Sequence, residues 1–164
     1  MELKINSKSS LAMKILIIDD DKVDRASLKR DLRNTNLVSE IVEEDTGLSG
    51  IERFKQESFE CVLLDYYLPD IQGPKVLQEL VRIGGEFLSV IAITGTESET
   101  MPELMLAAGA SDYLIKDEIN TRVMERVLRF VLKKNQHQKV YEEQLRILTE
   151  KLEVSNKKLE KLAK

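Results

Sequence analysis

Acidic residues stand at the ends of short apolar runs in this sequence. Three aspartates, Asp19–Asp21, directly follow the run 14–18, and Asp65 follows the run 61–64. Carboxylates that are brought into one cleft repel one another, and a divalent cation relieves that repulsion. Oxygen ligands select a hard ion, and magnesium typically takes one or two carboxylates together with a phosphate oxygen. The pattern therefore predicts a Mg²⁺ site if the fold brings these acids together.

Two other polar residues occupy matching positions. Thr94 ends the apolar run 90–93, and Lys116 follows the run 113–115. A lysine supplies a localised positive charge and a threonine supplies a hydroxyl, so that with a cation they could bind a phosphoryl group. Taken singly, each residue has an ordinary explanation, such as a helix cap at Asp21 or a surface lysine. Only the joint pattern indicates chemistry.

The elements that must position these side chains alternate along the chain. Short apolar runs rich in β-branched residues predict strands that are buried on both faces. They cover 14–18, 38–42, 61–64, 90–93 and 113–115, the second being flanked by charge and expected nearer an edge. Amphipathic helical patterns lie between them. Repeated strand and helix predict a doubly wound α/β fold, in which the carboxyl ends of the strands meet at one edge and form the ligand site.

The region after Asp117 contains neither glycine nor proline, and we expect a helix from near Glu118 to the end. Apolar residues recur there at alternating steps of four and three, if Ser155 fills one position, which predicts a parallel coiled coil between two copies. The dimer seam comprises Tyr141, Leu145, Leu148, Leu152, Leu159 and Leu162. The polar stretch 133–139 is either a solvated helical bridge or a break. The alternative is a solvated helix that packs on its own domain.

Composition limits the function classes. The 164 residues carry a net charge of −4, with 42% hydrophobic and 33% charged residues. These values predict one domain with an appendage, and they argue against nucleic-acid binding through the phosphate backbone. Cys61 is the single cysteine, which excludes an intrachain disulfide. No apolar run approaches the roughly 20 residues that span a bilayer, and no secretory signal is visible, so we expect a cytoplasmic protein.

The motifs ILIIDDD, CVLLDYYLPDIQG, VIAITG and AGASDYLIKD resemble those of receiver domains in two-component response regulators, including the chemotaxis regulators. The resemblance covers roughly residues 13–132, which leaves 1–12 as a flexible extension and 133–164 as a coiled-coil linker. It implies a flavodoxin-like, five-stranded parallel sheet in the order 2-1-3-4-5. One departure is Asp117, which stands where many receivers have a proline.

The resemblance also implies roles for the acids. Asp65 would be the phospho-acceptor, and Mg²⁺ would be bound by Asp20 directly, by Asp19 largely through water, by Asp65, and by the backbone carbonyl of Tyr67.

The remaining roles concern the phosphoryl group itself. Thr94 and Lys116 would bind it, and Tyr113 matches the switch aromatic of the family. The donor would be the phosphohistidine of a histidine kinase, and the chain would be a signalling receiver rather than an enzyme.

The tail VSNKKLEKLAK resembles the linker that precedes diguanylate cyclase or histidine kinase domains, so we expect a fragment of a larger protein. Two alternatives stay open at this point. One is a receiver-fold dimerisation scaffold that is not phosphorylated. The other is an aspartyl-phosphate phosphohydrolase of the haloacid-dehalogenase type, although Tyr67 stands where that family needs an acid.

Overall fold

The strands form one parallel sheet in the order β2-β1-β3-β4-β5. The computed structural model describes residues 12–85, 87–95 and 99–164, so that most of the predicted extension 1–12 lies outside the described residues. The strands are β1 (Met13–Ile18), β2 (Val38–Glu44), β3 (Cys61–Asp65), β4 (Val90–Thr94) and β5 (Asp112–Ile115). The predicted fold class and strand order are thereby confirmed.

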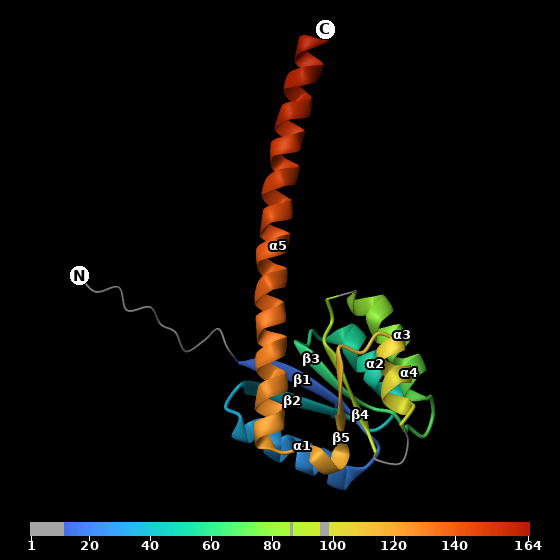
Figure 1. The fold of residues 1–164 in the computed structure, drawn as a ribbon. Helices are drawn as coiled ribbons and strands as arrows, with labels where there is room; N and C mark the ends of the chain where they lie inside the picture. The colour runs from blue at the N-terminus through green and yellow to red at the C-terminus, as the bar shows by residue number, and fades with distance from the viewer. Residues whose placement is uncertain (1–11, 86, 96–98) are drawn as a thin grey trace, which may run out of the picture.

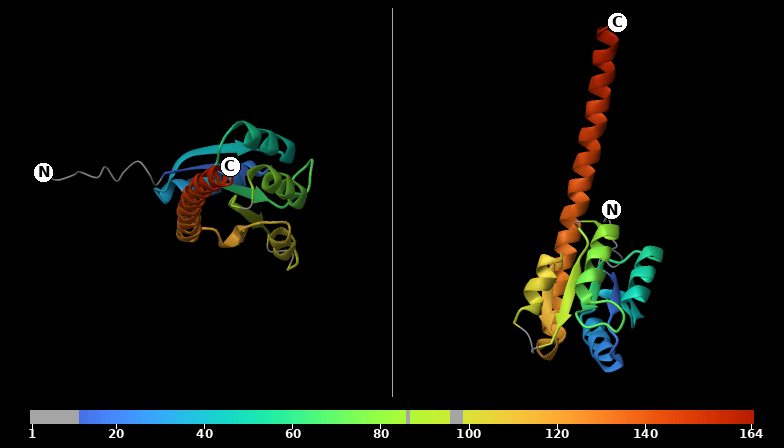
Figure 2. Two further views of the ribbon diagram at one scale, coloured as in Figure 1. Left: turned by 90° about the horizontal axis from the view of Figure 1, so that it is seen from above. Right: turned by 90° about the vertical axis from the view of Figure 1, so that its right-hand side faces the viewer.

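Helices cover both faces of this sheet (Figures 1 and 2). They are α1 (Lys22–Asn34), α2 (Gly47–Gln56), α3 (Gly73–Gly84), α4 (Met101–Ala107) and α5 (Thr121–Leu162). Side chains of α1 and α5 join the core on one face, and side chains of α2, α3 and α4 join the core on the other. The two cores explain why β1, β3 and β4 are almost continuously apolar. Strand β2 lies at an edge and is only partly buried, as its flanking charges predicted.

Side-chain caps fix where the helices begin. The Asp21 carboxylate accepts hydrogen bonds from the backbone N–H groups of Val23 and Asp24, which confirms the predicted cap of α1. Asn120 caps α5 in the same way. Residues Lys116–Glu118 form a short 3-10 turn, so that α5 begins at Thr121 rather than near Glu118.

Helix α5 continues without a break through the polar stretch 133–139 and leaves the domain (Figure 1). Its early apolar residues, among them Met124 and Leu128, are buried against the sheet. Farther along, the Lys134 ammonium group donates hydrogen bonds to the Leu88 carbonyl at 3.3 Å and to the Ser111 hydroxyl at 3.4 Å. Those partners precede β4 and β5, so this anchor lies at the amino-terminal edge of the sheet. The domain boundary at 132/133 stays a prediction.

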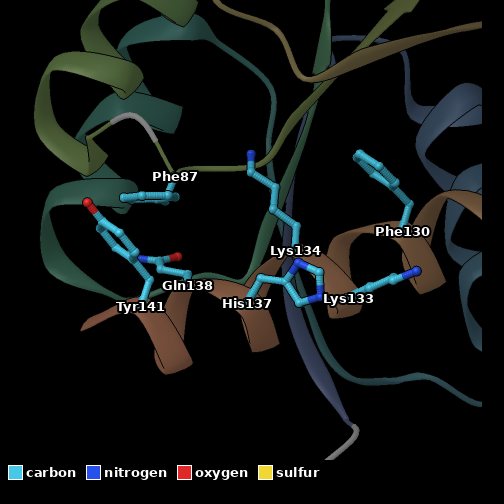
Figure 3. A pocket seen from close by; sticks show the side chains of 7 residues that line it. All are labelled: Phe87, Phe130, Lys133, Lys134, His137, Gln138 and Tyr141. Carbon is cyan, nitrogen blue, oxygen red and sulfur yellow. The ribbon is translucent and has the colours of Figure 1, made fainter. Parts of the chain in front are cut away.

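A hollow lies beside this anchor, between α5 and the segment that leads into β4 (Figure 3). The rings of Phe87 and Tyr141 pack at a tilt of 48°, with centroids 6.4 Å apart. Three side chains with basic nitrogen atoms line the same hollow, namely Lys133, Lys134 and His137. Among the helices that the structure describes, we find no candidate for a transmembrane span.

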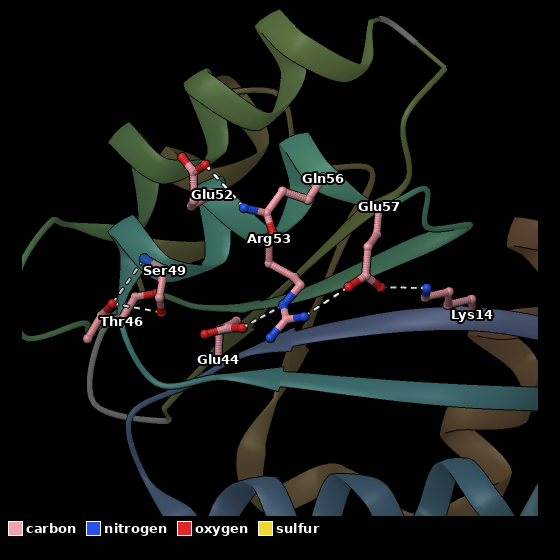
Figure 4. A network of polar contacts seen from close by, with 8 residues as sticks. All are labelled: Lys14, Glu44, Thr46, Ser49, Glu52, Arg53, Gln56 and Glu57. Carbon is pink, nitrogen blue, oxygen red and sulfur yellow. Dashed lines mark hydrogen bonds and ion pairs between the residues drawn. The ribbon is translucent and has the colours of Figure 1, made fainter.

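A network of ion pairs ties α2 to the edge of the sheet (Figure 4). Arg53 pairs with Glu44 of β2 at 2.8 Å and with Glu57 at 2.9 Å. Glu57 in turn binds the ammonium group of Lys14 on β1. At the other end of α2, the Thr46 hydroxyl accepts a hydrogen bond from the Ser49 backbone N–H. The network holds α2 over β1 and β2, with contacts at the carboxyl end of β2 through Glu44 and at the amino end of β1 through Lys14.

We expect the substitution Gly73→Ala to destabilise the protein. A Cβ atom at Gly73 would lie 2.8 Å from the Tyr66 carbonyl oxygen and 2.9 Å from that of Asp65, and backbone cannot yield as a side-chain end can. The expected loss is about 2 kcal/mol in the free energy of unfolding, measured by urea denaturation. Gly95→Ala is the matched control, because a Cβ there meets nothing within 4 Å. Equal stability of the two variants would contradict this close packing.

Candidate functional site

The predicted site residues lie at one edge of the sheet. Asp19 follows β1, Asp65 is the last residue of β3, Thr94 is the last residue of β4, and Lys116 follows β5. All these strands are parallel, so their carboxyl ends reach the same edge. The fold therefore brings together the side chains whose spacing along the chain first suggested chemistry.

Three carboxylates form a cluster there. Asp19, Asp20 and Asp65 each offer one oxygen, and these oxygens all lie within 4.8 Å of one another. Asp19 and Asp65 are buried, whereas Asp20 is exposed. The Asp19 carboxylate also accepts a hydrogen bond from the Asp21 backbone N–H at 2.8 Å, which fixes its orientation. A set of hard oxygen ligands in this arrangement suits Mg²⁺.

The ammonium group of Lys116 lies among three carboxylates. Its Nζ is 2.6 Å from Asp24 Oδ2, 3.1 Å from Asp65 Oδ2 and 3.5 Å from Asp19 Oδ2. Burial lowers the pKa of Lys116, but the hydrogen bond to Asp24 and the charges of Asp65 and Asp19 outweigh it, so the pKa lies above its usual value. Lys116 is therefore a fixed positive charge at neutral pH.

The two buried acids are difficult to ionise together. Burial is the main cause that raises the pKa of Asp19 to about 6, and the neighbouring charge of Asp65 raises it further. Burial also raises the pKa of Asp65, while Lys116 opposes that change. The cluster thus carries unrelieved repulsion near neutral pH, which a bound cation would remove.

Four buried side-chain oxygen atoms lack a hydrogen-bond partner among the described residues, and two of them belong to predicted site residues at this edge of the sheet. One is Asp19 Oδ2 and the other is the hydroxyl oxygen of Thr94, whose side chain is fully buried. A buried polar atom without a partner costs free energy, and a bound ligand or ion is one way in which such an atom gains a partner. Both atoms belong to residues that the sequence pattern had singled out.

The two tyrosines that the family resemblance singled out occupy the rim. The backbone N–H of Tyr67 lies 3.4 Å from Asp65 Oδ1, and the Tyr67 ring is exposed and packs edge-on against Tyr66. Tyr113 pairs with Ala92 in the β4–β5 register, two residues before Thr94, so Tyr113 and Thr94 lie on the same face of the sheet. Tyr113 is exposed at the surface.

Sequence reasoning missed two acids near the site. Asp24, in the first turn of α1, makes the shortest contact to Lys116. Asp70, in the loop after β3, accepts hydrogen bonds from the backbone N–H groups of Gly47 and Leu48, both at 2.8 Å, at the start of α2. A signal for Asp24 was available, because a helix that starts directly after Asp21 must place its first turn at the same edge.

Comparison with known proteins identifies related sequences. Residues 15–128 match the family described as "Response regulator receiver domain". The histidine-protein kinase BarA of Escherichia coli is 29% identical over 137 residues, covering 78% of this chain and 14% of that protein. The chemotaxis protein CheY of Bacillus subtilis is 27% identical, covering 71% of this chain and 96% of that protein. The response regulator MprA of Mycobacterium ulcerans is 30% identical, and the match spans 44% of its length.

Solved structures share the fold. A CheY-like receiver domain from Methanospirillum hungatei superposes with a TM-score of 0.67 at 27% identity, covering 77% of this chain and 98% of that one. The receiver domain of a sensor histidine kinase from Pseudomonas aeruginosa, described with a magnesium ion coordinated in its active-site cleft, has a TM-score of 0.66 at 22% identity. It covers 74% of this chain and 98% of that one.

We expect Asp19→Asn to stabilise the protein when divalent cations are chelated. The amide is not repelled by Asp65, so the free energy of unfolding at about pH 7.5 should rise by about 1 to 3 kcal/mol in urea denaturation. A raised carboxyl pKa makes the ionised acid destabilising in the folded state. The penalty is full above the folded pKa of about 6 and absent below the unfolded value of 3.8.

The gain from Asp19→Asn should therefore shrink as the pH falls from about 7.5 to about 4. Asp112→Asn, at the opposite edge of the sheet where β5 starts, is the control and should change little. A gain that does not depend on pH would show that charge repulsion is not its cause.

Proposed function

Because the chain belongs to the response regulator receiver domain family, we propose that Asp65 accepts a phosphoryl group from the phosphohistidine of a histidine kinase. Receiver domains are signalling domains that pair with histidine kinases and lack a catalytic output module of their own. The chain spans about one-seventh of BarA and less than half of MprA, so the activities of those whole proteins are not transferred to it. The proposal concerns residues 13–132, with the cytoplasm as the expected location.

The observation that carries the proposal is the setting of Asp65. Its side chain is buried at the end of β3, next to an ammonium group at 3.1 Å and within a cluster of acids. If a carboxylate served only to stabilise the fold, we would expect its negative charge to be balanced by positively charged partners. Here carboxylates outnumber the one ammonium group that contacts them in the described structure. Such a site is arranged to gain further positive charge and a phosphoryl group.

The residues present fit a magnesium ion. Asp20 and Asp65 would bind it directly, Asp19 would act largely through water, and the Tyr67 carbonyl would complete the protein ligands. When bound, Mg²⁺ supplies positive charge that offsets the negative charge of the transferred group. The buried Asp19 oxygen that lacks a hydrogen-bond partner supports this fit.

The residues of this chain would contribute to the transfer mainly by positioning the reacting groups. One oxygen of Asp65 forms a bond to phosphorus while the bond from phosphorus to the donor's imidazole nitrogen breaks, and the electron pair of that bond stays on nitrogen. Lys116, already 3.1 Å from Asp65, holds a positive charge beside the new acyl phosphate. No separate base is required, because Asp65 attacks as a carboxylate.

The switch would follow from Thr94 and Tyr113. The unpartnered Thr94 hydroxyl can donate to a phosphoryl oxygen, which gives it the hydrogen bond that it lacks. Movement of Thr94 vacates space on the face of the sheet that Tyr113 shares, so the Tyr113 ring can turn inward. The surface formed by α4, β5 and α5 would change as a result.

Helix α5 would carry this change to a dimer. The seam residues of the predicted coiled coil are all exposed, from 45% at Leu145 to 82% at Leu162. Parallel pairing of two chains would bury this stripe, with residues 133–164 acting as the linker. Intrahelical ion pairs such as Arg146 with Glu143 and Glu150 support the helix on its polar sides.

We expect acetyl phosphate and Mg²⁺ to add one phosphoryl mass to the intact protein. Asp65→Asn should abolish this labelling, because an amide is not a nucleophile for phosphorus. Asp112→Asn, at the opposite edge of the sheet, is the matched control and should be labelled as the unaltered chain is. The measurement is intact-protein mass spectrometry.

Two outcomes would contradict the assignment of Asp65. Persistent labelling of Asp65→Asn would place the phosphoryl group elsewhere. Absence of labelling in the unaltered chain, under conditions that label a known receiver, would favour the alternative function of an unphosphorylated dimerisation scaffold. The exposed seam alone is consistent with that alternative.

We expect the full chain to sediment as a dimer and the chain without residues 140–164 to sediment as a monomer. Leu152→Glu should also give a monomer, because it places charge in the seam. Ile147→Glu is the matched control, since Ile147 is an exposed apolar residue of the same helix that lies off the seam. The seam assignment is wrong if both glutamate variants behave alike in sedimentation velocity.

A further inference from the structure

Lys116 makes its shortest contact with an acid that lies outside the carboxylate cluster. The distance from its Nζ to Asp24 Oδ2 is 2.6 Å, against 3.1 Å to Asp65. Asp24 belongs to the first turn of α1, while the cluster of possible metal ligands is formed by Asp19, Asp20 and Asp65. The side chain of Asp24 is 37% exposed. Neither its position nor its contacts make it a nucleophile or a metal ligand.

We propose that Asp24 is a positioning residue that holds the ammonium group of Lys116 in competition with the phosphoryl group on Asp65. The inference rests on the proposed function and deepens it. Asp24 would set the affinity of the site for a phosphoryl group. It would therefore also set the fraction of molecules in the switched state at a given concentration of phospho-donor.

The competition follows from the number and direction of charges. Lysine is a compact charge on a flexible stem, so one ammonium group can turn between acceptors. The hydrogen bond to Asp24 is charge-assisted and short, and such bonds are the stronger ones. The three N–H donors of Lys116 already face three carboxylates, so a phosphoryl oxygen that binds the ammonium group draws it away from one of these acceptors and weakens the bond to Asp24.

The exposure of Asp24 makes the exchange reversible. When Lys116 turns away, water can solvate the Asp24 carboxylate, and the amino-terminal turn of α1 favours a negative charge at that position. Asp24 therefore opposes phosphoryl binding by a moderate amount and does not lock the site. A buried acid in the same place would have been left uncompensated.

The same geometry predicts that Asp24 has the opposite effect on the binding of Mg²⁺. If Asp24 loses its charge, Lys116 has only Asp65 and Asp19 as carboxylate partners among the contacts that the described residues make with it. It would then lie closer to the cluster and repel Mg²⁺. Removal of the Asp24 charge should thus weaken Mg²⁺ binding and strengthen phosphoryl binding, a combination that a purely structural role would not produce.

The test uses the full chain with beryllofluoride as the phosphoryl mimic at saturating Mg²⁺, followed by NMR titration. Asp24→Asn should bind beryllofluoride about five- to ten-fold more tightly and Mg²⁺ alone about three-fold more weakly. Asp24→Glu should restore both affinities toward those of the unaltered chain, because it keeps the charge. Asp45→Asn is the matched control, as Asp45 is exposed at the same edge of the sheet, after β2.

A second measurement reports the pair without phosphorylation. We compare the shifts in urea midpoint caused by Asp24→Asn, by Lys116→Met and by the double substitution in the absence of Mg²⁺. The shift of the double variant should differ from the sum of the two single shifts, because the two residues contact each other. Additive midpoints, an unchanged beryllofluoride affinity in Asp24→Asn, or an equal gain in Asp45→Asn would each overturn the role of Asp24. If the unaltered chain binds no beryllofluoride, the proposed function itself fails and the competition fails with it.

Discussion

A single ammonium group holds together the acidic edge of this protein. Lys116 contacts Asp19, Asp24 and Asp65 at once, and it reaches them because β1, β3 and β5 are parallel strands whose carboxyl ends lie at the same edge of the sheet. Without that charge, two buried carboxylates would face each other in a medium that disfavours both. The parallel topology brings these carboxylates close together, and it also places Lys116 beside them, where its positive charge reduces their repulsion.

The rest of the fold holds this edge in place despite the repulsion between its carboxylates. Both faces of β1 and β3 are sealed by apolar cores, one with α1 and α5 and the other with α2, α3 and α4. Caps and ion pairs outside the cores fix the helices, as Asp21 does for α1 and Arg53 does for α2. Two of the buried polar atoms that lack a hydrogen-bond partner, in Asp19 and Thr94, lie where a ligand can supply one, while Asp31 and Ser89 outside the site each have such an atom as well.

Much of this could be predicted from the sequence because parallel strands that are buried on both faces have a plain signature. The runs 14–18, 61–64 and 90–93 are short and apolar, and the polar residues Asp19, Asp65 and Thr94 follow them directly, so both the sheet and its functional edge could be predicted. Ion pairs between distant elements leave no such periodic signal, and the contact between Asp24 and Lys116, 92 residues apart, depends on tertiary geometry. Continuity of α5 through 133–139 could not be decided either, since a polar stretch suits a solvated helix and a break equally well.

The unbroken α5 has a mechanical consequence. The helix starts near the acidic edge, crosses the domain, and is anchored by Lys134 at the opposite edge before it extends into solvent. The length beyond that anchor is about 40 Å at the rise of an α-helix. A tilt of about 0.1 radian about the anchor would displace the far tip by roughly 4 Å. Such a lever converts a side-chain-sized adjustment under the helix into a movement comparable to the spacing of neighbouring atoms across a helix–helix contact.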